Sequence, residues 1–358
     1  MPAEDLTLPS LDLRALARRA AVPAAIAAAL VAAVTVLGGP LETFADAIRR
    51  AVEADPAWVA GAAAFELLSF AGYIATLWLV GSRASNRLGL KETTQITLGG
   101  AAATRLLPTA GVGGAAMTLW ALRRSGLGTR GATGTLLTFL VLVYAVFLSA
   151  IAVAGTVLAV TGDGPLMLTA LPAALAVVGM LLAVAAAWWM PAEGIGRVRT
   201  VGAVLGGSVR AAIGHLRSAD PRLLGAIAWW GFDMAVLYGM LNAFGTPPAF
   251  QVVVLAYFLG QVANTVPVPG AASGGLVGVL LAFGVEADLA IVAVLAYRAV
   301  AIWIPAPIGV LALGHLRRTM SRWEREDADP ELVAAPEPQA TVVPLPRPAW
   351  RPAEVVAA

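Results

Sequence analysis

Long apolar segments separated by short polar segments make up most of the chain between residues 21 and 320. A helix needs about 20 apolar residues to cross the hydrocarbon core of a bilayer. Segments near or above this length cover residues 58–80, 135–160, 166–190, 223–244 and 289–304. The pattern therefore predicts an all-α, polytopic membrane protein of about six to eight transmembrane helices.

A further apolar run, 21–37, follows a polar segment that contains Arg14, Arg18 and Arg19. Basic residues before an apolar run are also typical of a signal peptide, and residues 45–47 resemble a small-residue cleavage site. We predict a retained first helix, because the run is long and further spans follow it.

Two other segments have the periodicity of a helix that lies on a membrane surface. In 41–52, apolar residues share one face and Glu42, Asp46 and Arg49 share the other. The second segment lies in a basic stretch, where the apolar positions are Val201, Leu205, Ile213 and Leu216.

The apolar segment 96–122 is interrupted by Pro108 and three glycines. Basic residues flank it on both sides, and by the positive-inside rule both ends are then cytoplasmic. We therefore predict a re-entrant hairpin of two half-helices. Two complete but short crossings are the alternative.

A second interruption, at residues 267–275, has a similar mixture of proline and glycine. The apolar remainder, 276–283, is too short to cross a bilayer alone. We predict that 250–283 forms a second re-entrant unit, which enters from the outside. Broken helices in the two halves of a membrane chain are typical of transporters built from inverted repeats, so such repeats are one interpretation of the fold.

Composition supports the same class. The 358 residues are 59% hydrophobic and 13% charged, whereas soluble domains average about 45–50% and 25%. A net charge of +2 gives no indication of nucleic-acid binding. The absence of cysteine excludes disulfides, thiol catalysis and cysteine metal sites. We expect no cofactor and no metal.

The residues offer little for catalysis. The two histidines, His215 and His315, both lie in basic flanking segments, and neither H-E-x-x-H nor G-x-S-x-G occurs. We therefore expect that the protein is not an enzyme. An intramembrane lipid-modifying enzyme is the weaker alternative.

Four ionisable residues lie near the centres of apolar segments: Glu66, Arg105, Asp233 and Arg298. Buried charges are costly, so pairing is expected. One hypothesis is that two ion pairs only fix helix packing. The other is that Arg105 and Arg298 bind an anionic group such as a lipid phosphate, since a guanidinium donates two parallel hydrogen bonds.

Under the second hypothesis the interrupted segments line the same cavity, because half-helix N-termini attract anions. Glu66 and Asp233 would then be counter-charges for the arginines. The candidate substrate-binding residues are Arg105, Pro108, Gly111, Gly113, Asn264, Pro269, Gly270 and Arg298.

Motifs on both sides of the two breaks resemble a known family. They occupy residues 95–97, 103–106, 111–114, 120–126, 228–233, 267–270, 293–298 and 303–305. Together they resemble the flippase-like family, the transmembrane region of lysylphosphatidylglycerol synthases, which also occurs as stand-alone bacterial proteins. The resemblance covers about residues 20–320. It implies a plasma-membrane protein that moves a lipid between leaflets, with Arg105, Pro269, Gly270 and Arg298 at its site.

The chain departs from that resemblance at residues 271–275, which are uncharged where relatives usually carry an acidic residue. No synthase domain follows the membrane region, so we do not expect synthase activity. We divide the chain into a cytoplasmic N-terminal segment (1–20), a flippase-like transmembrane domain (21–320) and a disordered, proline-rich cytoplasmic tail (321–358).

The prediction is a multi-pass protein of the bacterial plasma membrane that moves an anionic phospholipid or a lipid-linked substrate. A non-transporting scaffold with structural buried charges is the alternative. Membrane lipids are the expected partners, and no nucleic acid is expected. A homo-oligomer, or a lipid-synthesising enzyme as partner, stays open.

Overall fold

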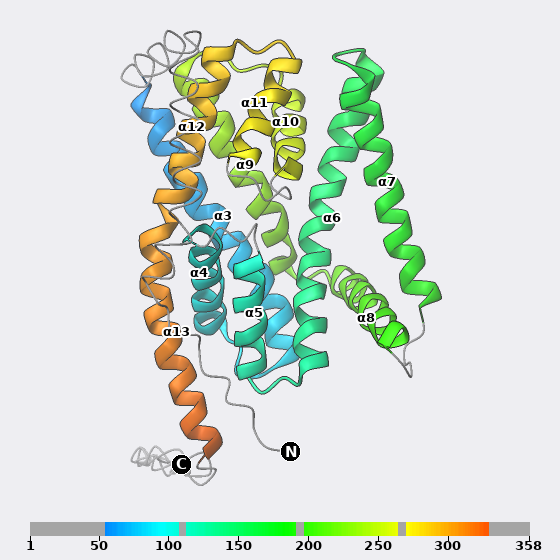
Figure 1. The fold of residues 1–358 in the computed structure, drawn as a ribbon, viewed down its shortest axis with the longest axis vertical. Coiled ribbons are helices and arrows are strands. Elements are labelled where there is room, and N and C mark those ends of the chain that lie inside the picture. Colours follow the sequence, from blue (N-terminus) through cyan, green and yellow to red (C-terminus); the bar gives the residue numbers. More distant parts are fainter. Residues whose placement is uncertain (1–53, 107–111, 191–196, 264–269, 329–358) are drawn as a thin grey trace, which may run out of the picture.

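The computed structural model describes residues 54–106, 112–190, 197–263 and 270–328, and every regular element within these ranges is a helix. The helices form an elongated bundle, and the helix of residues 166–189 stands off to its side (Figure 1). Five helical segments among the described residues are long and apolar enough to cross a membrane. The all-α prediction is confirmed, and the chain is an integral membrane protein.

The first half of the bundle starts with α3 (Pro56–Ala84), a full-length span. Its start is fixed locally: Pro56 occupies the first turn, and the Asp55 carboxylate accepts a hydrogen bond of 2.8 Å from the backbone N–H of Ala57. A hairpin and a second span follow. The hairpin consists of α4 (Leu90–Leu106) and α5 (Val112–Arg124), and the second span is α6 (Thr129–Thr161).

The hairpin α4–α5 returns to the end of the bundle from which it starts (Figure 1). The loops at its two outer ends touch, because the Ser85 hydroxyl donates to the backbone oxygen of Ser125 over 2.9 Å. This end of the bundle carries Arg83, Arg124 and Arg130, and we call it the basic end. The prediction of a re-entrant hairpin is confirmed, and that of two complete crossings is wrong.

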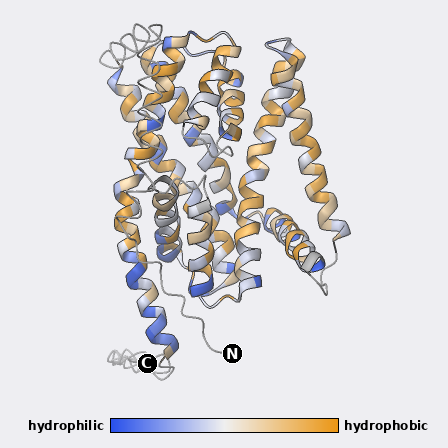
Figure 2. Cartoon of the chain, viewed as in Figure 1, coloured by the Kyte–Doolittle hydropathy of each residue, from blue (hydrophilic) through white to orange (hydrophobic). Residues whose placement is uncertain are grey.

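Next come α7 (Leu166–Trp189) and α8 (Arg197–Arg217). The turn between α6 and α7 contains Gly162 with a φ of 77°, a left-handed conformation that suits glycine. Helix α7 stands away from the bundle and packs on α6 and α8 (Figure 1). Most of its surface is apolar and exposed, as expected for a lipid-facing span (Figure 2). The predicted surface helix is α8, which packs on α6 and α7 toward the basic end.

The second half reverses the direction of the first. A short 3₁₀ turn, η1 (Pro221–Leu223), leads into α9 (Leu224–Phe244), which runs away from the basic end. The second hairpin, α10 (Phe250–Val262) and α11 (Ala271–Ala282), enters from the opposite end (Figure 1). The chain returns through α12 (Ala287–Trp303) and α13 (Pro305–Ala328).

Each element of the first half therefore has a counterpart of opposite direction. Span α3 corresponds to α9, the hairpin α4–α5 to α10–α11, and α6 to α12. The inner ends of both hairpins lie near mid-height in the bundle (Figure 1). This is the arrangement that an inverted repeat predicts.

Helix α13 corrects the boundary of the predicted tail. It continues to Ala328, so residues 321–328 are helical rather than disordered. The reason is packing: Met320 and Trp323 are buried, and the Thr319 hydroxyl donates to the Gln95 side chain of α4 over 2.7 Å. The predictions for residues 1–53, including the first helix and the first surface helix, and for 329–358 lie outside the described residues.

Candidate functional site

A polar cluster joins three helices near the inner end of the second hairpin. Both Tyr257 of α10 and Tyr297 of α12 donate hydrogen bonds to the same carboxylate oxygen of Asp233 on α9, and the bond from Tyr297 is 2.8 Å long. The Gln261 amide donates to the Tyr297 hydroxyl over 3.1 Å. Hydrogen bonding of this kind is what allows a carboxylate to remain inside an apolar bundle.

The local sequence explains how the cluster forms. Tyr257 and Gln261 are four residues apart on α10, so they share one face of that helix. Both tyrosines are fully buried, at 0% and 1% exposure. Because α10 ends at Val262, this polar face lies where the hairpin stops inside the bundle.

Glu66 occupies the equivalent level on α3. The rings of Phe65 and Phe232, the residues just before Glu66 and Asp233, stack with centroids 5.9 Å apart. The two acidic residues therefore follow a shared contact between α3 and α9. The Glu66 side chain is completely buried.

Arg298 lies beside this cluster on α12. Its guanidinium carbon is 5.3 Å from the ring centroid of Tyr297. Its Nε and Nη2 atoms are buried, and neither has a hydrogen-bond partner among the residues that the structure describes. The sequence predicted an acidic partner, but the described partners of Asp233 are tyrosine hydroxyls rather than an arginine.

The remaining predicted residues lie at the hairpin breaks. Arg105 is the next-to-last residue of α4, so its backbone is at the inner end of the first hairpin, and Gly113 lies in the first turn of α5. Gly270 caps the start of α11 with a φ of 82°, a conformation that strains any other residue. The positions outside the described residues are Pro108, Gly111, Asn264 and Pro269.

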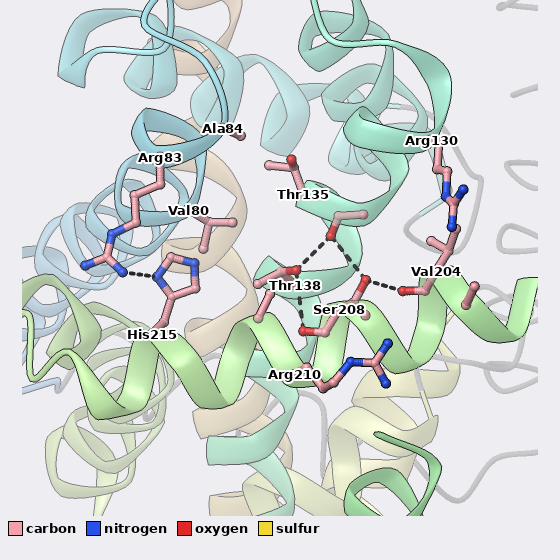
Figure 3. A pocket seen from close by; sticks show the side chains of 14 residues that line it. Val80, Arg83, Ala84, Arg130, Thr135, Thr138, Val204, Ser208, Arg210 and His215 are labelled. Atoms are coloured by element: carbon pink, nitrogen blue, oxygen red, sulfur yellow. Dashed lines mark hydrogen bonds between the residues drawn. The ribbon is translucent and has the colours of Figure 1, made fainter. Parts of the chain in front are cut away.

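A separate pocket of about 410 Å³ opens at the basic end, between α3, α6 and α8. Arg83, Arg130, Arg210 and His215 line it together with hydroxyl side chains (Figure 3). Arg83 donates to Nδ1 of His215 over 3.0 Å, so in this arrangement Nε2 carries the ring hydrogen. Burial of the imidazole, and then the charge of Arg83, lower the pKa of His215 from its ordinary value.

A comparison with protein families identifies the family of this chain. The model of the lysylphosphatidylglycerol synthase TM region matches residues 20–309. The chain belongs to this family. A search of curated proteins returns no match.

The matched region of this chain, residues 20–309, includes both hairpins, the Asp233 cluster and the basic pocket, and it ends within α13. The resemblance inferred from the sequence motifs is thus confirmed.

Sequence reasoning missed the uncharged members of the cluster. Tyr257, Gln261 and Tyr297 are ordinary residues in apolar helices, and their meeting depends on how three helices pack. A signal existed for one pair, because Tyr257 and Gln261 place two polar groups on one face of an otherwise apolar helix. The pocket was missed because its arginines were counted only as basic flanks.

Proposed function

We propose that this protein moves an anionic phospholipid, or a lipid-linked substrate with a phosphate group, between the leaflets of the membrane. The observation that carries the proposal is Arg298, whose Nε and Nη2 atoms are buried without a described partner. Buried N–H donors of a charged group are costly when they lack an acceptor, and an ionisable residue inside a membrane span is by default a functional candidate. An anionic headgroup would satisfy both N–H groups at once.

The hairpins support this role. The N-termini of α5 and α11 are the inner ends of their half-helices, and they lie inside the bundle at mid-height (Figure 1). The partial positive charge of such ends favours an anion nearby. Two hairpins that enter from opposite ends would expose the site to either leaflet in turn.

Asp233 and its tyrosines would position the arginine. The ring of Tyr297 is in contact range of the guanidinium while its hydroxyl is fixed by Asp233. A guanidinium above an aromatic face is restrained without losing its donors. The site would then present Arg298 in a fixed orientation to the incoming phosphate.

The test uses the purified full chain in vesicles that contain a fluorescent phosphatidylglycerol in both leaflets. A reductant added outside bleaches the outer leaflet, so translocation appears as a continued loss of fluorescence. We expect the wild-type protein to accelerate this loss and Arg298→Gln to abolish the acceleration. Arg298→Lys should restore only part of it, because an ammonium cannot donate in parallel.

The matched control is Arg199→Gln, which removes the same charge from an exposed position on α8. It should translocate lipid at the wild-type rate. Equal translocation by wild-type protein and Arg298→Gln, with both variants reconstituted to the same density, would contradict the site assignment.

A non-transporting scaffold is the second candidate, and one observation favours it. The carboxylate of Asp233 is held by two tyrosines from two other helices, which is also how a purely structural cluster would look. Under this alternative, the wild-type protein leaves the fluorescence loss unchanged, and substitutions in the cluster alter only thermal stability.

The remaining properties follow from the same proposal. We infer a bacterial plasma membrane location with both termini in the cytoplasm, because the basic end would then face the cytoplasm. Transport needs no bond to be made or broken, so we propose a transporter rather than an enzyme. Membrane lipids are its proposed partners.

A further inference from the structure

The pocket at the basic end is unrelated to the Asp233 cluster and has a distinct chemistry. Arg83 comes from α3, Arg130 from α6 and Arg210 from α8, and all three line one cavity. Arg83 lies beside His215 on one side, and Arg130 and Arg210 lie toward the other (Figure 3). None of the residues that line it is acidic. Such a concentration of guanidinium groups in one hollow is typical of sites that bind phosphate.

The floor of the pocket is a set of hydroxyl contacts between α6 and α8. The Ser208 hydroxyl lies 3.3 Å from the carbonyl oxygen of Gly134, and the Thr138 hydroxyl lies 3.4 Å from the carbonyl oxygen of Ser208. These small side chains let the two helices approach and fix the distance between their arginines.

Two of the three arginines are held in place by neighbouring groups. Arg210 uses Nη1 to donate to the carbonyl oxygens of Ala187 and Met190 at the end of α7. Its Nη2 lies next to Gly207, which lines the pocket, and has no partner within the described ranges. Arg83 is fixed by His215, Ser218 and Asp220.

One carboxylate lies near the pocket, and it is already engaged. Asp220 accepts hydrogen bonds from the Arg222 side chain over 2.7 Å and 3.0 Å, and these hold the pKa of its carboxyl well below the usual range. It meets Arg83 only at 3.4 Å. Asp220 therefore offsets part of the charge of two arginines and none of that of Arg130 or Arg210.

The helix that closes the pocket has the surface of an interfacial helix. The residues of α8 include four arginines and no acidic residue. Val201, Leu205 and Leu216 are apolar and exposed on this helix, at 58%, 41% and 58%. Exposed apolar residues beside arginines are typical of a helix that lies among lipid headgroups, where anionic lipids attract it.

From this geometry we infer that the α3–α6–α8 pocket binds the phosphate group of an anionic lipid headgroup, at a site separate from the Asp233 cluster. Arg130 and Arg210 donate to the phosphate oxygens, and Arg83 contributes charge from the α3 side. The exposed apolar residues of α8 accompany the acyl chains. Occupancy fixes α8 against α3 and α6 and does not require lipid translocation.

The test measures binding of dioleoyl phosphatidylglycerol to the full-length chain in detergent micelles, by native mass spectrometry and by the shift in melting temperature. Dioleoyl phosphatidylcholine is the zwitterionic comparison. We expect phosphatidylglycerol to bind more tightly and to raise the melting temperature more. Arg210→Gln and Arg130→Gln should each weaken its binding about tenfold, the loss expected for hydrogen bonds to a charged group.

The matched controls are Arg199→Gln and Arg217→Gln, which remove a charge from α8 outside the pocket. Each should change the affinity less than about twofold, since distant exposed charges are screened. The proposal is overturned if Arg217→Gln weakens binding as much as Arg210→Gln, or if phosphatidylglycerol binds no better than phosphatidylcholine. Arg130→Gln provides an independent test if loss of the α7 contacts impairs folding of Arg210→Gln.

Added inorganic phosphate identifies the source of the phosphate group. If inorganic phosphate displaces phosphatidylglycerol, the site accepts phosphate itself. If only the lipid binds and raises the melting temperature, the site requires the lipid headgroup. In the Arg298→Gln background, which removes the proposed transport site, Arg210→Gln should still weaken phosphatidylglycerol binding about tenfold. A failure of transport and a failure of this pocket are thus separable.

Discussion

Gly72 on α3 and Gly225 on α9 lie against each other so closely that neither can carry a side chain. A Cβ atom added to Gly72 would lie 2.5 Å from the carbonyl oxygen of Gly225, and the reverse contact is equally short. The two helices belong to opposite halves of the bundle. This contact therefore fixes how the two halves cross, and with them the positions of Glu66 and Asp233.

Substitution of either glycine should destabilise the protein. Gly72→Ala or Gly225→Ala forces the helix backbones apart, and overpacking of this kind costs about 1–3 kcal/mol. The melting temperature of the purified protein measures the effect. Gly231→Ala is the control, because nothing lies within 4 Å of a Cβ atom there. It should leave stability equal or raise it slightly, since alanine favours a helix more than glycine does. Equal melting temperatures for all three variants would show that α3 and α9 can separate freely.

The Asp233 cluster should depend on each hydroxyl. Tyr297→Phe keeps the packing of the ring and removes one of the two hydrogen bonds to the carboxylate. A hydrogen bond to a charged group contributes about 1.5–3 kcal/mol. We expect a lower melting temperature, together with slower lipid translocation in the vesicle assay.

Tyr144→Phe controls for the loss of a hydroxyl as such, because Tyr144 is 51% exposed on α6. It should match the wild-type protein in both assays. A Tyr297→Phe protein that is less stable but translocates lipid at full rate would assign the cluster a structural role.

The hydrophobic pattern determined most of the fold in advance. Spans, the direction of both hairpins and the surface helix α8 follow from segment length, interruptions at proline and glycine, and the distribution of arginine. These are local properties, so one sequence reveals them. The inverted relation between the halves followed from the same properties, because Arg residues flank the first hairpin on both sides and not the second.

The site was predicted only in part, because its geometry depends on packing between distant segments. Charge alone identified Asp233 and Arg298, but the partners of Asp233 are neutral hydroxyls from α10 and α12. A rule that opposite charges pair could not find them. The C-terminal boundary of the membrane domain was predicted wrongly for the same reason. The sequence after residue 320 is polar, but Trp323 is buried in a contact that sequence periodicity did not reveal.

The imidazole of His215 predicts a pH dependence of stability. Burial and Arg83 lower its pKa in the folded protein below the ordinary value of 6.5. As the pH falls through that value, the unfolded chain binds a proton that the folded chain does not, so the free energy of unfolding decreases. The decrease ends below the folded-state pKa. Asp220 moderates it, because its carboxylate raises the pKa of His215.

His215→Asn tests this prediction, since the amide oxygen can accept from Arg83 without titrating. The melting temperature of the wild-type protein should fall more between about pH 7.5 and about pH 5.5 than that of His215→Asn. His315→Asn, at an exposed position on α13, should follow the wild-type protein. Parallel curves for wild type and His215→Asn would show that this imidazole is accessible to protons in the folded state.

Two tryptophans test whether the last turns of α13 belong to the membrane domain. Trp323 is 2% exposed, whereas Trp303 at the end of α12 is 75% exposed. Trp323→Ala leaves a cavity between α13 and its neighbours, and the loss of a buried tryptophan costs about 3–5 kcal/mol. We expect a large fall in melting temperature for Trp323→Ala. For Trp303→Ala we expect a small fall, which corresponds to a loss of less than about 1 kcal/mol in the free energy of unfolding. Equal and small effects would mean that residues 321–328 form a helix that packs too loosely to stabilise the bundle, and the domain would then end near residue 320 after all.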